Sequence, residues 1–567
     1  MTISALAEFG RRWWFTPCVV LVATALVLPV NGYVYGIYDH EYHIPRLAWL
    51  KDPALFNPHD PFVETLDAYP SVFWWLLQAL SDIISVPALF LALYYLSQCI
   101  FGYTMLRLAR LLYGSQLIAW LSFAAFLLTK STSGFYKFPD GQFVPRTLVF
   151  PVAILALELF LRGYWYPSFF LAGLAVNLHG RVAVHLLVLL GAGLLWQTRR
   201  SSMKHSIFAL AVAAVGAAPS IFWQFINPGD VPLFAVDKEW VDIVKLALPT
   251  MQNIFTDEPV ILFAHLSTLG FLVVFLIAQR MHPAEHHQET LLVWVLASIG
   301  MILLGGLFTD VFPMPVLMQF EFVRAGMFLP FFALPAFLNS VVREWRLRRM
   351  PGPSAALLIA AALAAPFGSA TALVAAVIRL PGPRRFSTVV VIVLSVSAVV
   401  SSGYYFALKH YTDQTWLVAP PDNAWVEAAK WAKESTPKDA IVLFPPYLDT
   451  AQLGGGFRVI SQRSVVVSRH EGDLSALRYA YALQWYGRMH DLSAGLYTTE
   501  TPLTESYMVI EKGFRSLSRD HLIALAKKYE ASYLLLAVDQ IIDLPPVFKN
   551  AEFVVYAVPS GERVVAP

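Results

Sequence analysis

Long apolar stretches recur along the first 407 residues of this 567-residue chain. A helix needs about 20 apolar residues to cross the hydrocarbon core of a bilayer, and many of these stretches approach that length. Only 14% of the residues are charged, whereas a soluble domain has about a quarter. Because the alternating pattern of a membrane barrel is absent, the sequence predicts a polytopic α-helical membrane protein.

Basic residues set the expected orientation of these spans. Arg11 and Arg12 precede the first apolar stretch, which lacks a cleavage signal, so we expect an uncleaved anchor with a cytoplasmic N-terminus. The segment 355–378 is expected to be one span or a hairpin of two. We expect 11 or 13 spans and an outside C-terminus, which a single crossing at 355–378 would reverse. The other candidate spans are 13–35, 86–106, 116–129, 144–161, 168–178, 182–196, 207–225, 260–278, 290–308, 325–341 and 386–406.

The pattern changes after residue 407, so we divide the chain into a membrane module, 1–407, and an extracytoplasmic α/β domain, 408–567. The stretch from Gly454 to Gly456 is expected to be a flexible loop, because it lacks the Lys-Ser/Thr of a phosphate-binding loop. Helices are expected at 423–434 and 517–529, and strands at 440–444, 464–467, 533–537 and 553–558.

A cluster of ionisable residues follows the first span and opens the long outer loop, 36–70. It contains Asp39, His40, Glu41 and His43, and the two histidines are candidate ligands or supports of the site. Such groups are costly at a membrane boundary unless they are paired or solvated, so they indicate a functional site. Asp39 lies closest to the rigid span and is the candidate proton acceptor for a hydroxyl nucleophile. The alternative is a solvated acidic loop.

Two further aspartates of this loop, Asp52 and Asp60, each precede a proline and are expected mainly to form turns. Asp60 is also kept as a supporting residue for the site. A divalent cation, Mg²⁺ or Mn²⁺, is a further candidate ligand of this region, although no zinc spacing occurs. If the loop were helical, Asp39 and His43 would share a face and Glu41 would point away.

Arg146, Arg181 and Arg324 are expected on the outer side, against the positive-inside tendency. A guanidinium held at a helix end needs an anionic partner, and its planar fork suits phosphate oxygens. The alternative partners are nearby carboxylates, Asp140 and Glu321. Two histidines close to these spans, His179 and His185, are candidates for orienting the same ligand.

Together these residues resemble the GT-C superfamily of integral-membrane glycosyltransferases. The likeness lies in residues 38–45 with Asp52-Pro53 and Asp60-Pro61, in 143–146, in 177–179 and in 457–463. The resemblance implies a polyprenyl-phosphate-linked sugar as donor, a glycan, lipid or protein acceptor, and a bacterial inner-membrane location. The Trp-Trp-Asp acceptor motif of oligosaccharyltransferases is absent, so peptide glycosylation is not inferred.

The same resemblance implies roles for individual residues. Asp39 would be the general base, and Glu41 its substitute or a ligand of metal or sugar. The three arginines, with His179, would hold the phosphate of the leaving group. A transporter or flippase of a lipid-linked glycan, and a non-catalytic envelope-assembly protein, are the competing hypotheses. Nothing in the sequence predicts a nucleic-acid partner.

Overall fold

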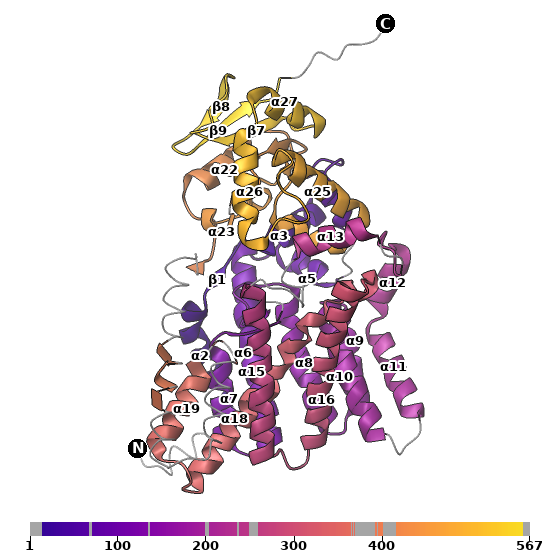
Figure 1. Ribbon diagram of the computed structural model, residues 1–567, viewed down its shortest axis with the longest axis vertical. Helices are drawn as coiled ribbons and strands as arrows, with labels where there is room; N and C mark the ends of the chain where they lie inside the picture. The colour runs from indigo at the N-terminus through magenta and orange to yellow at the C-terminus, as the bar shows by residue number, and fades with distance from the viewer. Residues whose placement is uncertain are drawn as a thin grey trace.

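The computed structural model describes residues 14–66, 71–133, 136–198, 203–234, 237–248, 259–364, 366, 368, 392–393, 395–397, 399–400, 416–448 and 450–559. Figure 1 shows a bundle of helices at one end of the long axis and a sheet with its own helices at the other. The helices α3 (His40–Lys51), α5 (Phe73–Leu80) and α13 (Lys238–Ala247) lie where these two parts meet.

The bundle is built from apolar helices. In the described part of the chain, five helices are long and apolar enough to cross a membrane, or six if the bent pair α11–α12 is one span. The ten spans expected between residues 13 and 341 all fall on helices. Most of 365–406 lies outside the described residues, so the total of 11 or 13 stays a prediction. The bundle helices are α2 (Phe15–Asn31), α6 (Val86–Tyr113), α7 (Gln116–Leu127), α8 (Pro145–Leu161), α9 (Trp165–Val176), α10 (Gly180–Thr198), α11 (Lys204–Gly216), α12 (Ala218–Ile226), α15 (Pro259–Met281), α16 (Gln288–Gly306), α18 (Leu329–Arg346) and α19 (Gly352–Ala364).

Small residues allow close helix packing in this bundle. A Cβ added at Gly173 of α9 would lie 2.1 Å from the carbonyl oxygen of Ala213 in α11. In α11, a Cβ at Gly216 would lie 2.6 Å from the carbonyl oxygen of Phe170. Contacts of this kind are typical of membrane helices, where close backbone approach replaces the hydrophobic driving force available in water.

The first outer loop is more regular than the sequence predicts. It forms α3 and the short helix α4 (Pro61–Thr65) instead of a chain of turns. The carboxylate of Asp60 caps α4 by accepting from the Phe62 N–H at 3.0 Å, and Pro61 occupies the first helical position. Asp39 is the N-cap residue of α3, so a helix fixes its position.

The C-terminal part contains a five-stranded mixed sheet in the order β6-β5-β7-β9-β8. β5 pairs in parallel with β6 and β7, whereas β9 pairs antiparallel with β7 and β8. Four strands coincide with the predicted ones, and β8 was not predicted. The bounds are β5 (Ile441–Leu443), β6 (Ser464–Val465), β7 (Tyr533–Ala537), β8 (Pro546–Lys549) and β9 (Phe553–Ala557).

Helices cover both faces of this sheet, because alternate strand residues point to opposite sides. Val442 packs in the cluster of Trp425 from α22 (Ala424–Ser435). Its neighbours Ile441 and Leu443 belong to the opposite core. That core also holds side chains of α25 (Tyr479–Leu492), α26 (Ser506–Ser516) and α27 (Arg519–Lys528).

The two parts of the molecule are joined by backbone pairing. β1 (Tyr33–Val34), which follows α2, pairs in parallel with β4 (Trp416–Leu417). The Gly456 N–H donates to the Gly36 carbonyl at 2.8 Å. A Cβ at Gly456 would lie 2.6 Å from Glu41 Cγ. The expectation of a flexible glycine loop is therefore wrong: the backbone here must approach the first outer loop closely.

Candidate functional site

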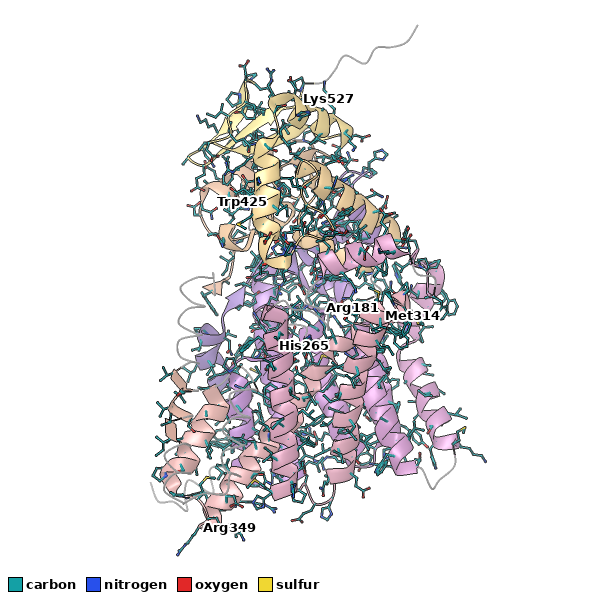
Figure 2. All side chains as sticks on the ribbon, viewed as in Figure 1. Arg181, His265, Met314, Arg349, Trp425 and Lys527 are labelled. Atoms are coloured by element: carbon teal, nitrogen blue, oxygen red, sulfur yellow. The ribbon has the colours of Figure 1, made fainter. Side chains whose placement is uncertain are left out.

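Charged residues predicted from distant parts of the sequence meet at the sheet-facing end of the bundle. Arg181, labelled in Figure 2, marks this level between the bundle and the sheet. The cluster takes residues from the start of α3, from both sides of the α8 start, from the α9–α10 turn and from the segment around η3 (Phe322–Phe328). Its members are Asp39, His43, Asp140, Arg146, His179, Arg181, Glu321 and Arg324.

One half of the cluster, which we name the acidic group, consists of Asp39, Asp140 and Arg146. Arg146 Nη1 donates to Asp39 Oδ2, and Arg146 Nε donates to Asp140 Oδ2 at 2.6 Å. About a sixth of each side chain is exposed to solvent. A single guanidinium thus holds two carboxylates, and the group has one excess negative charge.

The other half, which we name the basic group, consists of Arg181, Arg324 and Glu321. Arg181 Nη1 donates to Glu321 Oε1, and Arg324 Nη1 lies 2.8 Å from Glu321 Oε2. The Glu321 side chain is fully buried, while both arginines are partly exposed. Two guanidinium groups share one carboxylate, which gives the basic group one excess positive charge.

Backbone strain accompanies both groups. Glu321 has φ +49°, and Tyr38, directly before Asp39, has φ +53°. Residues other than glycine rarely adopt this left-handed conformation, and strained residues cluster at functional sites. The contacts of the cluster therefore hold two backbone positions that these side chains disfavour.

The two groups are electrostatically coupled. Burial raises the pKa of the Asp39 carboxyl, but the positive charge of Arg146, with a smaller contribution from Arg324, outweighs burial, so this pKa is well below its usual range. Burial raises the pKa of Asp140, and the negative charge of Asp39 raises it further. Asp39 is therefore ionised at neutral pH.

The alternative that nearby carboxylates are partners of the arginines agrees with the structure: Asp140 pairs with Arg146, and Glu321 with the other two. Since each group has an unequal number of charges, this pairing does not neutralise either one. A ligand with an anionic end and a proton-donating end would complement both. Phosphate binding by the three arginines stays a prediction.

The histidines of the region differ in their roles. His43 shares a helix face with Asp39, as predicted for a helical loop. The backbone N–H of His43 donates to the backbone carbonyl of Asp39 at 3.1 Å, which is the helical pattern. Burial holds the pKa of His43 well below its usual range. The pKa of His179 is also well below its usual range, first because of burial and then because of Arg181. Both rings are therefore neutral, and His179 Nδ1 accepts from the Val182 N–H at 3.3 Å.

His40 is a structural residue, which corrects the expectation that it supports a ligand. Its Nδ1 accepts from the Gly36 N–H at 3.1 Å, and its Nε2 lies 2.8 Å from the Phe143 carbonyl oxygen. Both ring nitrogens are thus occupied by backbone groups. The ring ties the start of α3 to the segment before α8.

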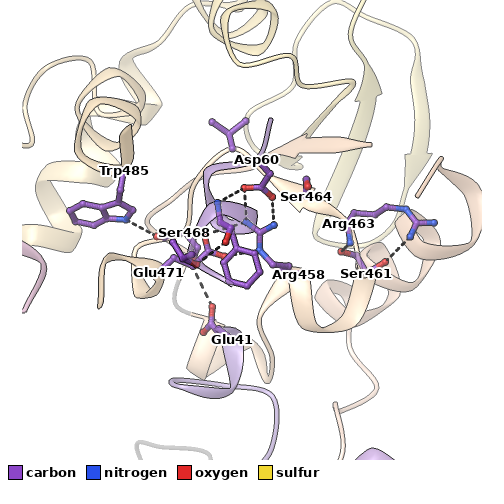
Figure 3. Close-up of polar contacts among 12 residues, drawn as sticks. Glu41, Asp60, Arg458, Ser461, Arg463, Ser464, Ser468, Glu471 and Trp485 are labelled. Atoms are coloured by element: carbon purple, nitrogen blue, oxygen red, sulfur yellow. Dashed lines mark hydrogen bonds and ion pairs between the residues drawn. The ribbon is translucent and has the colours of Figure 1, made fainter. Parts of the chain in front are cut away.

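The structure places Glu41 outside the cluster, which corrects its expected catalytic role. Glu41 Oε1 accepts from the Thr450 hydroxyl, and Oε2 lies 3.5 Å from Ser468 Oγ. Figure 3 shows Glu41 directed at Ser468 of the C-terminal part. Residues two positions apart on a helix point in different directions, so the side chains of Asp39 and Glu41 lie on different faces of α3. This agrees with what the sequence predicts for a helical loop.

Asp60 is also remote from the cluster, although it was expected to support the site. Its carboxylate pairs with Arg458, which donates through Nε to Glu471 Oε1 at 2.8 Å (Figure 3). All three side chains are almost fully buried. We name Asp60, Arg458 and Glu471 the buried triad; it fastens the first outer loop to the C-terminal part.

Asp473 is a candidate functional residue that sequence reasoning missed. It lies in η4 (His470–Ala476) of the C-terminal part. The His470 ring packs 6.0 Å from the ring of Tyr38, and Gln319 Nε2 donates to the Ala476 carbonyl at 2.9 Å. These contacts hold η4 beside Tyr38, the residue before Asp39, and beside Gln319, two residues before Glu321. The available signal was the acidic residues Glu471 and Asp473, which follow a predicted strand after a few residues.

The surroundings of Asp473 perturb its ionisation. Burial raises its pKa to about 7, with a further contribution from the negative charge of Asp39. Arg324 and Arg181 act in the opposite direction. Asp473 is therefore coupled to both groups and titrates in the range that suits proton transfer at neutral pH.

A metal site is not supported by the donor set. Across the described residues, no group of three or more histidine, cysteine, aspartate or glutamate side chains converges in a way that would hold an ion. Because His40 is engaged by backbone and Glu41 by Thr450, the donors expected in this loop do not fit together. We assign no step to Mg²⁺ or Mn²⁺.

Comparison with known proteins adds two findings. Residues 423–492 match a family described as a domain of unknown function, DUF6798. No curated protein sequence matches the chain.

Two solved structures of ArnT from Cupriavidus metallidurans are similar to this chain. The apo structure has a TM-score of 0.44 and 13% identity, and the similarity covers 96% of this chain and 98% of that one. The structure described as bound to undecaprenyl phosphate has a TM-score of 0.40 and 12% identity, with 99% of both chains covered. At these values the likeness carries no argument about the reaction, so the interpretation of the site rests on its residues.

Proposed function

We propose that this protein is a membrane glycosyltransferase. It would move a sugar from a polyprenyl-phosphate-linked donor to an acceptor hydroxyl on the extracytoplasmic face of the membrane. The observation that carries the proposal is the separation of charge in the cluster. Two arginines share one glutamate in the basic group, while two aspartates share one arginine in the acidic group. Cleavage of a sugar phosphate needs both a cationic and an anionic partner.

The basic group supplies the phosphate site in this proposal. Arg181 and Arg324 are the donors, because both guanidinium groups pair with the one carboxylate of Glu321 and both are partly exposed. As the bond from the anomeric carbon to the phosphate oxygen breaks, negative charge grows on the leaving phosphate. Preoriented guanidinium groups stabilise that charge more in the transition state than in the bound donor. The apolar bundle helices are the natural surroundings of an isoprenoid tail.

The acidic group receives the acceptor. The acceptor hydroxyl attacks the anomeric carbon, a new carbon–oxygen bond forms, and the hydroxyl proton must move to a base. Asp39 is ionised and lies at the fixed start of α3, so we assign it that proton. Its low pKa makes it a weak base while it is paired with Arg146, and Asp473, with a pKa of about 7, is a stronger acceptor for the onward proton.

This role of Asp473 predicts a pH dependence. Transfer should rise as pH increases through about 7, where Asp473 loses its proton, and Asp473→Asn should flatten this limb of the rate profile.

The same residue predicts a pH dependence of stability. The pKa of Asp473 in the folded protein is raised above the unfolded value of about 3.9, so the folded state binds more protons between these values. Stability should therefore fall as pH rises through this window.

The stability readout provides a control for the rate readout. Asp473→Asn should remove this loss of thermal stability between pH 4 and 7, as measured by melting temperature against pH. Glu505→Gln, an exposed acidic residue of the same C-terminal part, should leave both profiles unchanged. An Asp473→Asn protein with the wild-type rate profile would exclude Asp473 from the proton path.

The direct experiment is a transfer assay with purified protein in detergent, where no compartments exist and a transporter has nothing to transport. Polyprenyl-phosphate sugars are incubated with the protein, and release of polyprenyl phosphate is measured by mass spectrometry. Arg324→Gln should raise KM for the donor about 10- to 100-fold, as expected for loss of one charged hydrogen bond. Arg280→Gln, at an exposed helix end, is the control.

The donor panel decides the outcome. If the wild-type protein leaves every polyprenyl-linked sugar intact with glycan, lipid and peptide acceptors present, the transferase hypothesis is wrong. Transfer that Arg324→Gln leaves unaffected would remove the basic group from the phosphate site.

A further inference from the structure

A cavity lies at the bend between α11 and α12. Its volume is about 40 Å³, and it is partly open to the surroundings. Its wall comes from α3, the start of α5 and the first turn of α12. The residues that matter here are Arg46, Trp49, Trp74, Trp75, Ser220 and Trp223.

The bend that forms this cavity is fixed by a single side chain. α11 and α12 meet at 66°. Asn177 Nδ2 donates to the Gly216 carbonyl at 2.7 Å, and Asn177 Oδ1 accepts from the Ser220 N–H at 3.0 Å. The Asn177 carbonyl also accepts from the Val72 N–H at 2.9 Å, at the start of α5. The cavity is thus a built feature and not a gap between loosely packed helices.

The polar groups of the cavity favour an anionic oxygen. The Arg46 guanidinium carbon lies 5.4 Å from the centre of the Trp74 ring. Trp74 is only 1% exposed, and its indole Nε1 has no hydrogen-bond partner among the described residues. A buried N–H without a partner is costly, so a ligand oxygen placed there would be stabilised by the N–H and by the neighbouring cation.

The rim of the cavity is apolar and exposed. Trp75 of the cavity wall is 51% exposed, and Phe222 and Phe225, which belong to α12 but do not line the cavity, are 67% and 81% exposed. Tryptophan in such a position is typical of the interface between lipid head groups and acyl chains. An anionic oxygen site beside a lipid-facing apolar surface complements an amphiphile better than a soluble anion.

We propose that this cavity binds the phosphate-bearing head group of an anionic bilayer phospholipid, with its acyl chains along α12. Arg46 provides the charge, Trp74 donates its indole N–H, and the aromatic rim contacts the glycerol and upper chain carbons. The site differs from the proposed donor site in its residues: Arg46 and Trp74 are not members of the charged cluster, although the Trp74 ring centre lies 4.7 Å from that of His43. It does not depend on the transferase proposal.

The test measures lipid retained by the full chain. The protein is reconstituted in bilayers of phosphatidylcholine and phosphatidylglycerol, extracted, and examined by native mass spectrometry. We expect preferential retention of phosphatidylglycerol and about a tenfold weaker retention in Arg46→Gln, the loss of about 1.4 kcal/mol. Trp74→Phe removes the N–H donor and one ring of the indole while keeping an aromatic side chain, and should weaken retention about threefold to tenfold.

Matched controls keep the result interpretable. Arg343→Gln changes a partly exposed arginine in the last turn of α18 and should retain lipid as the wild type does. Arg349, which follows that helix, lies at the far end of the bundle in Figure 2. Asp39→Asn should also retain the lipid, so a failed transferase assay and a failed lipid assay are distinguishable.

Equal retention of both lipids, or retention unchanged in Arg46→Gln and Trp74→Phe, would overturn the proposal. Displacement of the lipid by soluble glycerol phosphate would overturn the assignment to a bilayer lipid. If Arg46→Gln does not fold, Trp74→Phe decides.

Discussion

Asp39→Asn is expected to lower the rate of sugar transfer about 10²- to 10⁴-fold, the usual contribution of a positioned acid–base group. The amide has nearly the same shape as the carboxylate but cannot accept the proton of the acceptor hydroxyl. Arg146 keeps its contact with Asp140 at 2.6 Å, so the fold should persist. The measurement is turnover of a polyprenyl-phosphate sugar in detergent, with the melting temperature as a check on folding.

Asp52→Asn is the matched control for this variant. Asp52 belongs to the same outer loop, is more exposed and pairs with Lys438 at 2.6 Å. Its carboxylate accepts from the Ala54 N–H at 3.2 Å, which supports its predicted role in a turn. Asp52→Asn should therefore transfer sugar at the wild-type rate. If Asp39→Asn were as active as Asp52→Asn, Asp39 would not be the proton acceptor.

Arg458→Leu is expected to produce the largest loss of stability, about 3–5 kcal/mol, because it leaves two buried carboxylates without their cation. Asp60 and Glu471 both pair with Arg458, and each of the three side chains is 4% exposed or less. Burial already raises the pKa of Glu471. The loss should be measured by chemical unfolding, and limited proteolysis should release the C-terminal part from the bundle.

Arg515→Leu offers a control with the same number of partners in a solvent-exposed setting. Arg515 pairs with Glu511 at 2.8 Å and with Asp539 at 2.9 Å, and its side chain is 39% exposed. Exposed pairs contribute about 0–1 kcal/mol, so this variant should be nearly as stable as the wild type. Equal losses in the two variants would contradict a role for burial in the triad.

The bundle helices and four sheet strands could be predicted from the sequence because their signals are local. Length and hydropathy indicate the helices, and short runs rich in β-branched and aromatic residues indicate the strands. α3 was missed because its sequence contains Pro45 and alternating polar residues, which are typical of turns. Its packing against α24 (Phe457–Ser461) and η4 of the C-terminal part is a tertiary effect.

The candidate site was predictable in part for the same reason. The three arginines stood out because they break the expected distribution of positive charge. Two of their carboxylate partners are close in sequence: Asp140 to Arg146, and Glu321 to Arg324. The roles of Glu41 and Asp60 depend on Thr450 and Arg458, which are 409 and 398 positions away. No local pattern reveals such contacts. Asp473 was missed because only the docking of η4 brings it to the cluster.

The most direct test of the central claim is a structure determined by electron cryo-microscopy with a polyprenyl phosphate bound. We expect phosphate density in contact with Arg181 and Arg324, on the side of the basic group that faces Asp39. Phosphate density at another place, or both arginines still paired only with Glu321 in the presence of saturating lipid, would contradict the assignment.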